Sequence, residues 1–199
     1  MGTLQEQRAQ MLAGKVYNDL TDELIAARER TVLLTDEYNA SFGRPPEVRE
    51  EILTRLLGRA GRGAYFEPTL RCEFGFNITV GDGFYANFDC VMLDGGGITI
   101  GDNVLFGPRV SVYTTNHSLD PDERVRGACI ARRVEIGDRV WIGGGVTVNP
   151  GVTIGAGTVI GSGSVVTRPI PPMVLAAGVP CTVLRPITAA DRLGFSTLS

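Results

Sequence analysis

Several residue classes are scarce in this 199-residue sequence, and each shortage narrows what the protein can do. Basic residues are not in excess, and the net charge of −3 gives no electrostatic footprint for nucleic acid or an anionic membrane surface. Long apolar runs are missing, which argues against a membrane-spanning helix. The first ten residues, MGTLQEQRAQ, lack the apolar core of a secretory signal. We therefore expect a cytoplasmic protein that binds neither nucleic acid nor membranes.

Residues that bind metals are also few. His117 is the only histidine, and the four cysteines lie far apart with no C-x-x-C pair: Cys72, Cys90, Cys129 and Cys181. This spacing argues against a zinc site and favours reduced thiols. A repeat scaffold that binds a metal between subunits needs about three histidines. We expect no metal cofactor.

Residues 3–60 follow a helical period, although the chain as a whole is rich in glycine, with 26 residues. Apolar residues recur at helical spacing at Leu4, Met11, Leu12 and Val16. Thr21, followed by two acidic residues, predicts the start of a second helix. Pro45 and Pro46 predict the start of a third, which glycines end from Gly58 onward. The apolar face of that third helix holds Val48, Ile52, Leu53, Leu56 and Leu57.

From about Tyr65 the pattern changes to a repeat of six residues. Every sixth residue is apolar, with a shift of register in the run DGGG and one longer interruption. A flexible glycine-rich segment would not keep apolar residues in phase over so many hexads. The repeat therefore predicts a solenoid whose coils bury their apolar residues against one another.

Three hexads make one triangular coil of about 18 residues, so the expected fold is mainly β, a left-handed parallel β-helix of hexapeptide repeats. Stacked coils predict three internal ladders: Val80, Ile100, Ile136 and Ile154; Ala86, Phe106, Ile142 and Ile160; and Met92, Val112, Val148 and Val166. Glycine or asparagine follows most of these positions. We expect those residues to supply a positive φ at tight corners.

A polar loop, NHSLDPDERVRGACIARR at 116–133, interrupts the repeat. Insertions in solenoids map to loops on one face, which is often the functional face. We expect three regions: a helical cap at 1–62, the β-helix with its loop at 63–187, and a tail at 188–199. The part of the tail from Asp191 is expected to cover the last coil.

The hexads, the NH that opens the loop, and IPPMVLAAGVPCTVLR together resemble the hexapeptide-repeat acyltransferases. AGKVYNDLTDELIAARER, DEYNA, FYANF and WIGGGVTVNPGVTIGAGTVIGSGSVVT resemble more narrowly the maltose and galactoside O-acetyltransferase subfamily. The resemblance runs from about Gln7 to Ile187. It implies transfer of acetyl from acetyl-CoA to a sugar hydroxyl, in a homotrimer with active sites between subunits.

His117 is the candidate general base. An alcohol is a weak nucleophile at neutral pH, and imidazole is the side chain best suited to remove its proton. His117 opens the loop, where it matches the family's catalytic histidine. Direct attack in a ternary complex would produce an oxyanion, and the resemblance points to the backbone N–H of Gly144 as its donor.

The resemblance also implies the remaining site residues. Those matching acceptor-binding positions are Asp19, Arg28, Tyr85, Asn87, Asp94 and Cys129. Those matching the acetyl-CoA groove are Trp141, Gly144, Ser162, Thr167, Arg168 and Arg185. An exposed helix charge is the alternative explanation for Asp19 and Arg28, a solvated surface charge for Arg168 and Arg185, and packing between subunits for Trp141.

The sequence departs from the family at several of these positions. Glu73 stands where some galactoside enzymes have serine, Gly95 where relatives often have aspartate, and Cys129 where relatives have a bulkier apolar residue. Thr182 replaces an arginine of some relatives, which would weaken CoA binding. The alternative acceptors are an antibiotic, an amino sugar or a lipo-oligosaccharide, and the alternative class is a non-enzymatic trimeric scaffold.

Overall fold

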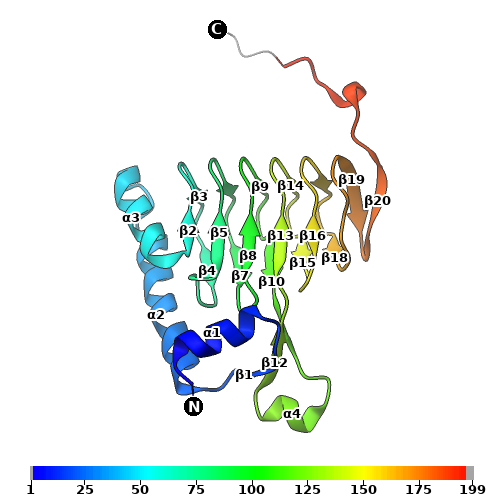
Figure 1. Ribbon diagram of the computed structural model, residues 1–199. Helices are drawn as coiled ribbons and strands as arrows, with labels where there is room; N and C mark the ends of the chain where they lie inside the picture. The colour runs from blue at the N-terminus through cyan, green and yellow to red at the C-terminus, as the bar shows by residue number, and fades with distance from the viewer. Residues whose placement is uncertain (1, 196–199) are drawn as a thin grey trace.

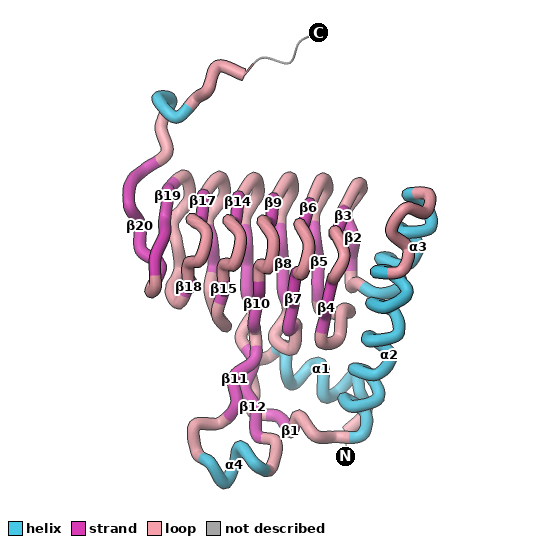
Figure 2. Tube along the Cα trace, turned by 180° about the vertical axis from the view of Figure 1, so that it is seen from behind, coloured by secondary structure: helices cyan, strands magenta, loops and turns pink. Residues whose placement is uncertain are grey.

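Three parallel sheets run side by side along the molecule and form the faces of a triangular prism (Figures 1 and 2). The structure is a computed structural model that describes residues 2–195. The chain visits the three sheets in turn and so forms a parallel β-helix, which confirms the fold class that the sequence predicts. Helices cover the end of the prism where the first coil begins (Figure 1).

Short strands, most of two or three residues, make up each face. The first face contains β2 (Arg59–Ala60), β5 (Ile78–Val80), β8 (Ile98–Ile100), β13 (Val134–Ile136) and β16 (Thr153–Ile154). The second contains β3 (Tyr65–Phe66), β6 (Tyr85–Ala86), β9 (Leu105–Phe106), β14 (Trp141–Ile142), β17 (Val159–Ile160), β19 (Val174–Gly178) and the antiparallel β20 (Cys181–Pro186). The third contains β4 (Leu70–Cys72), β7 (Cys90–Leu93), β10 (Ser111–Tyr113), β15 (Thr147–Val148) and β18 (Val165–Val166).

The predicted ladders are confirmed residue by residue. Val80, Ile100, Ile136 and Ile154 are successive partners on the first face. The Ala86 and Met92 ladders have the predicted registers on the second and third faces. All of these side chains are buried and together form the main core. Burial of an apolar ladder fixes the register, because a slip of one residue would turn every side chain outward.

The glycines after the ladder positions do not act as predicted. None of them has a positive φ; positive values occur two residues later, at Gly83, Asn103, Arg139 and others. Instead, the next coil passes too close for a side chain. A Cβ on Gly137 would lie 2.7 Å from the Ala156 nitrogen. These glycines are therefore required by close stacking of the coils rather than by backbone conformation.

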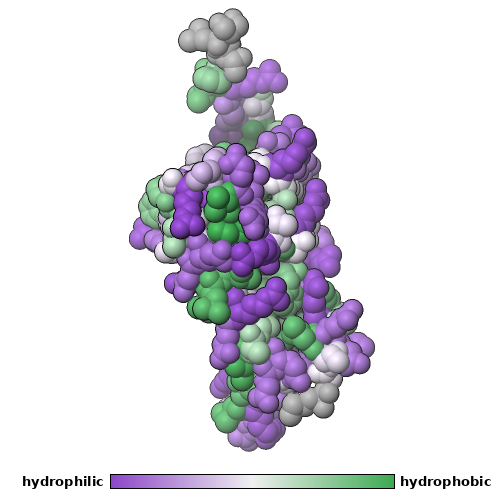
Figure 3. All heavy atoms as spheres, turned by 90° about the vertical axis from the view of Figure 1, so that its left-hand side faces the viewer, coloured by the Kyte–Doolittle hydropathy of each residue, from purple (hydrophilic) through white to green (hydrophobic). Residues whose placement is uncertain are grey.

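The cap has three main helices: α1 (Leu4–Leu12), α2 (Asp22–Asn39) and α3 (Pro46–Leu56). Thr21 caps α2 and Pro46 begins α3, as predicted. Val16 lies outside the first helix and is exposed, so its assignment to that helix is wrong; the chain extends into β1 (Tyr17–Asn18). Figure 3 views this end of the prism, where hydrophilic side chains surround separate hydrophobic patches.

The loop at 116–133 is more ordered than its polar sequence suggests. It contains β11 (Thr115–His117), α4 (Pro121–Val125) and β12 (Ala128–Ala131). β12 pairs antiparallel with β11 on one side and with β1 of the cap on the other. The loop and the cap therefore form one small sheet beside the prism (Figure 1).

The C-terminal tail does not cover the last coil. After β20 and a short 3-10 helix, Ala189–Asp191, the chain runs away from the prism (Figures 1 and 2). Leu193 and Phe195 are almost fully exposed, so the predicted capping role is wrong for the part of the tail up to 195. The last four residues of the predicted tail, 196–199, lie outside the described part. Among residues 2–195, none of the helices combines the length and apolar character needed to cross a bilayer.

Candidate active site

A cavity of about 280 Å³ lies where the small sheet meets the third face of the prism. Its walls come from the cap, from the end of β10 and from the next coil. The residues that line it are Asp19, Glu73, Leu93, Tyr113, Thr115, Asn116, His117, Asn149 and Pro150. Two of the predicted site residues, Asp19 and His117, therefore share one cavity although almost one hundred residues separate them.

His117 is the last residue of β11 and lies directly opposite Cys129 of β12. The sulfur of Cys129 is 3.1 Å from Nδ1 of the imidazole. Cys129 itself is buried, whereas His117 is exposed toward the cavity. One ring nitrogen is thus engaged by the loop, and Nε2 is the nitrogen left for a substrate.

Asp19, which lines the cavity, is held in place by an ion pair with Arg28 of α2. Nη1 of Arg28 lies 2.7 Å from Oδ1 of Asp19 and 3.4 Å from Oε1 of Glu73. Nη2 also donates to the Asp19 carbonyl oxygen. One guanidinium therefore joins the start of α2 to the residue after β4.

Glu73 is a carboxyl group that the sequence flagged only as a departure from relatives. Burial, together with the charges of Asp94 and Asp19, raises its pKa to about 7, against the opposing effect of Arg28. Its Oε2 is buried without a hydrogen-bond partner among the described residues.

Asp94 has a different role from the one predicted. It is fully buried, and its Oδ1 accepts hydrogen bonds from the backbone N–H groups of Phe74 and Gly75 at 2.8 and 3.1 Å. Its Oδ2 accepts from Asn77 N–H at 3.1 Å. Both oxygens serve the turn between β4 and β5, so the assignment of Asp94 to acceptor contact is not supported by its position.

A second group of predicted residues lies on the second face and at the corner that leads to the third. Tyr85 and Trp141 point outward from β6 and β14, and Trp141 is 53% exposed. Asn87, Gly144 and Ser162 all lie at that corner, Gly144 and Ser162 in adjacent coils and Asn87 two coils before Gly144. The N–H of Gly144 donates to no other group of residues 2–195, so it is free to stabilise an oxyanion.

The remaining predicted CoA residues lie further along the prism. Thr167 and Arg168 are exposed after β18, one coil beyond Asn149 of the cavity. Arg185 in β20 is exposed and paired with Asp191 at 2.6 Å. These three residues do not line the His117 cavity.

Within one chain the predicted catalytic residues therefore lie at two different corners of the prism. His117, Cys129, Asp19 and Arg28 lie at the corner between the third and first faces. Gly144 and its neighbours lie at a different corner, between the second and third faces. The described chain does not bring the candidate base and the candidate oxyanion donor together.

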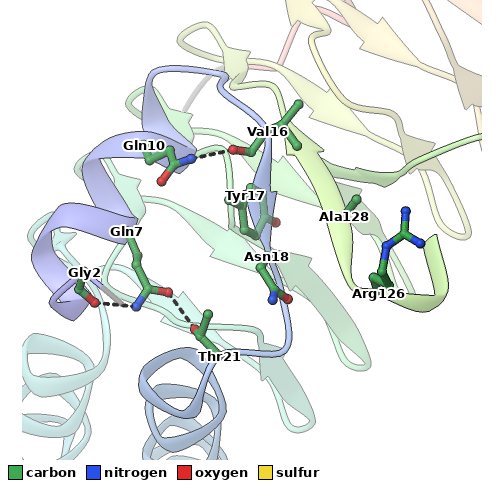
Figure 4. A pocket seen from close by; sticks show the side chains of 9 residues that line it. All are labelled: Gly2, Gln7, Gln10, Val16, Tyr17, Asn18, Thr21, Arg126 and Ala128. Carbon is green, nitrogen blue, oxygen red and sulfur yellow. Dashed lines mark hydrogen bonds between the residues drawn. The ribbon is translucent and has the colours of Figure 1, made fainter. Parts of the chain in front are cut away.

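A larger cavity, of about 450 Å³, lies between α1, β1 and the loop (Figure 4). The side-chain amides of Gln7 and Gln10 in its wall donate to backbone carbonyl oxygens. Gln7 donates to the Gly2 carbonyl at 2.8 Å and accepts from the Thr21 hydroxyl at 2.6 Å. It contains no histidine or carboxyl group, so we do not place the chemistry there. Across residues 2–195 there is no group of three or more His, Cys, Asp or Glu side chains arranged to hold a metal ion.

Comparison with known proteins connects both parts of the fold to one family. The maltose acetyltransferase hexapeptide capping motif matches residues 10–61, and the bacterial transferase hexapeptide (six repeats) matches residues 133–168. Galactoside O-acetyltransferase of Escherichia coli is 42% identical over 180 residues, which are 90% of this chain and 89% of that protein.

Two solved structures have the same fold over nearly the whole chain. A maltose O-acetyltransferase from Clostridium difficile superposes with a TM-score of 0.88 at 44% identity, covering 92% of this chain and 97% of that one. A galactoside acetyltransferase in complex with coenzyme A also gives 0.88, at 40% identity and 96% coverage of both chains. The chain belongs to the hexapeptide-repeat acyltransferases and, within them, to the maltose and galactoside O-acetyltransferase family.

Proposed function

We propose that this protein transfers the acetyl group of acetyl-CoA to a hydroxyl group of a sugar of the maltose, glucose or galactoside type. The observation that carries the proposal is the position of His117, which lines a cavity together with Asp19 and Glu73. Carboxyl groups and backbone groups around such a cavity can bind the hydroxyls of a sugar. The relatives with solved structures include one bound to coenzyme A.

In the proposed reaction His117 Nε2 removes the proton of the sugar hydroxyl as its oxygen attacks the thioester carbonyl. The N–H of Gly144 stabilises the resulting oxyanion. The tetrahedral intermediate collapses with cleavage of the carbon–sulfur bond, and the proton passes from His117 to the leaving thiolate of CoA. Transfer is direct, in a ternary complex.

This mechanism needs a second copy of the chain, because His117 and Gly144 occupy different corners of one prism. The outward residues of the second face favour such a copy. They are Tyr65, Tyr85, Leu105, Trp141, Val159 and Leu175, all apolar or aromatic. By contrast, the first face carries Arg59, Thr79, Thr99, Glu135 and Thr153 at the equivalent positions.

We propose a homotrimer in which the second face of each chain packs against a neighbour. Each active site then takes His117 from one subunit and Gly144 from the next. The acetyl-CoA arm would lie along the groove between them, with Trp141, Ser162, Thr167, Arg168 and Arg185 as its contacts. Tyr85 and Asn87 would reach the acceptor from the second subunit.

The acceptor in the proposed reaction is a neutral sugar. The capping-motif match over residues 10–61 favours a sugar over an antibiotic or a lipo-oligosaccharide. The test is a panel of maltosides, glucosides, galactosides, amino sugars and antibiotics, assayed by release of free CoA thiol from acetyl-CoA. Turnover of neutral sugars above all other acceptors would support the proposal. Turnover confined to antibiotics, or none with any acceptor, would overturn it.

A further inference from the structure

The imidazole of His117 has one contact that the proposed mechanism does not use. Its Nδ1 lies 3.1 Å from the sulfur of Cys129, which is opposite it in the antiparallel pair of β11 and β12. Cys129 is only 2% exposed, because β1 of the cap packs on its other side with Tyr17 as its partner. The sulfur is therefore held in place by two strands, and no other side chain of residues 2–195 bonds to the imidazole ring.

The direction of the hydrogen bond between His117 Nδ1 and the Cys129 sulfur decides which ring nitrogen of His117 carries the proton. A neutral imidazole has one N–H donor and one acceptor nitrogen. If Nδ1 donates to the sulfur, Nε2 keeps its lone pair toward the cavity and can act as a base. If the thiol instead donates to Nδ1, the ring proton moves to Nε2, and the base is blocked.

A second role for a Cys–His pair is nucleophilic catalysis, in which a thiolate takes the acyl group first. The surroundings of Cys129 oppose a thiolate. Burial raises the pKa of its thiol to about 11, and the carboxylates of Asp19 and Glu73 act in the same direction. A neutral, buried thiol is a poor nucleophile and cannot readily reach a thioester bound in the groove.

We propose that Cys129 is a positioning residue, whose sulfur accepts a hydrogen bond from His117 Nδ1–H and so keeps Nε2 unprotonated toward the acceptor. This inference rests on the proposed function of His117 as the base. It gives Cys129 a contact with the proposed base His117, whereas the family resemblance implies a contact with the sugar.

The presence of a single histidine allows a direct test. Protein labelled with 15N-histidine shows only the two ring nitrogens of His117, so its tautomer can be read by NMR without assignment. Measured above the range in which imidazole titrates, the wild type should carry its proton on Nδ1. In Cys129→Ala the Nε2–H tautomer should become a major species, whereas Cys129→Ser should retain the Nδ1–H tautomer, since a hydroxyl can also accept. A wild type with its proton on Nε2, or a Cys129→Ala variant with an unchanged tautomer, would overturn the proposal.

Kinetics provide the second measurement. Cys129→Ala should lower kcat about tenfold and change the acceptor KM less than about twofold, with partial recovery in Cys129→Ser. The control is Cys181→Ala, which removes a buried thiol from β20, remote from His117, and should leave both values near those of the wild type. A rise in acceptor KM with unchanged kcat would return Cys129 to the sugar site. An acetylated Cys129 trapped after incubation with acetyl-CoA would make it the nucleophile instead.

The two proposals fail in different ways. The tautomer is measured on the free protein and does not depend on any acceptor. If His117→Ala retained full activity, the proposed base would be wrong even with the Nδ1–H tautomer observed. If that variant were inactive and the tautomer were Nε2–H, only the role of Cys129 would be wrong.

Discussion

Asp19 and Arg28 form an ion pair of 2.7 Å that fixes the wall of the candidate acceptor cavity. The same guanidinium reaches Glu73 at 3.4 Å, so one positive charge is shared by two carboxyl groups. Because this network is only partly exposed, its charges interact more strongly than a pair in open solvent would. The cap therefore shapes the cavity chemically as well as sterically.

Loss of Arg28 should weaken acceptor binding. In Arg28→Ala, Asp19 loses the group that holds it and the two carboxyl groups are left to repel each other. We expect the acceptor KM to rise about tenfold with a smaller change in the KM for acetyl-CoA. Arg30→Ala, an exposed arginine on the same helix, is the matched control and should behave as the wild type. Equal effects of the two substitutions would contradict a specific role for Arg28.

Glu73 should make folding stability depend on pH. Its pKa is raised from 4.5 to about 7 in the folded protein, so the folded state binds a proton that the unfolded state has lost between these values. Stability from this group is complete below pH 4.5 and is lost as the pH rises through 7. Glu73→Gln cannot ionise and so does not have this loss. The free energy of unfolding of Glu73→Gln minus that of the wild type should therefore be larger at pH 8 than at pH 5, by on the order of 2 kcal/mol.

Urea unfolding of both proteins at several pH values measures this difference. Glu50→Gln, at an exposed position in α3, is the control and should track the wild type throughout. A constant difference between Glu73→Gln and the wild type would show that folding does not raise the pKa of Glu73.

Asp94→Asn should affect stability more than acceptor binding. Asp94 now accepts hydrogen bonds from the backbone N–H groups of Phe74, Gly75 and Asn77. An amide has only one oxygen to accept such bonds, and its NH₂ group would face at least one of these N–H donors. One lost bond to a buried N–H costs about 1–3 kcal/mol. We expect that decrease in unfolding free energy with an acceptor KM within about twofold of wild type. A tenfold higher KM at unchanged stability would restore Asp94 to the acceptor site.

A site shared between subunits predicts complementation. His117→Ala and Gly144→Pro should each be inactive, the second because proline has no N–H. In a mixed trimer, however, one site takes His117 from one variant and the Gly144 N–H from the other. Equal mixing under conditions that exchange subunits should restore roughly a quarter of wild-type activity.

Circular dichroism of Gly144→Pro checks that the variant is folded. No recovery of activity in verified mixed trimers would place the complete site within one chain.

The sequence was sufficient to predict the coils because inward residues such as Ile100 and Ile136 repeat at a spacing that only one stacking satisfies. It also placed His117 at the start of the loop that interrupts the coils. The role of Gly137 was not predictable, since a glycine required by a close backbone approach looks the same as one required by a positive φ. The backbone hydrogen bonds of Asp94 and the contact of Cys129 with His117 were not predictable for a related reason: each involves partners that only the fold brings together, which family position alone does not reveal.

The most direct test of the central claim is the rate of acetyl transfer by His117→Ala. With acetyl-CoA and the best sugar acceptor, kcat should fall about 10²- to 10⁴-fold while the trimer and the KM for acetyl-CoA are retained. Asn116→Ala, which alters the adjacent residue in the same cavity, should retain most of the activity. A His117→Ala enzyme with wild-type kcat would show that the base, and with it the proposed mechanism, is wrong.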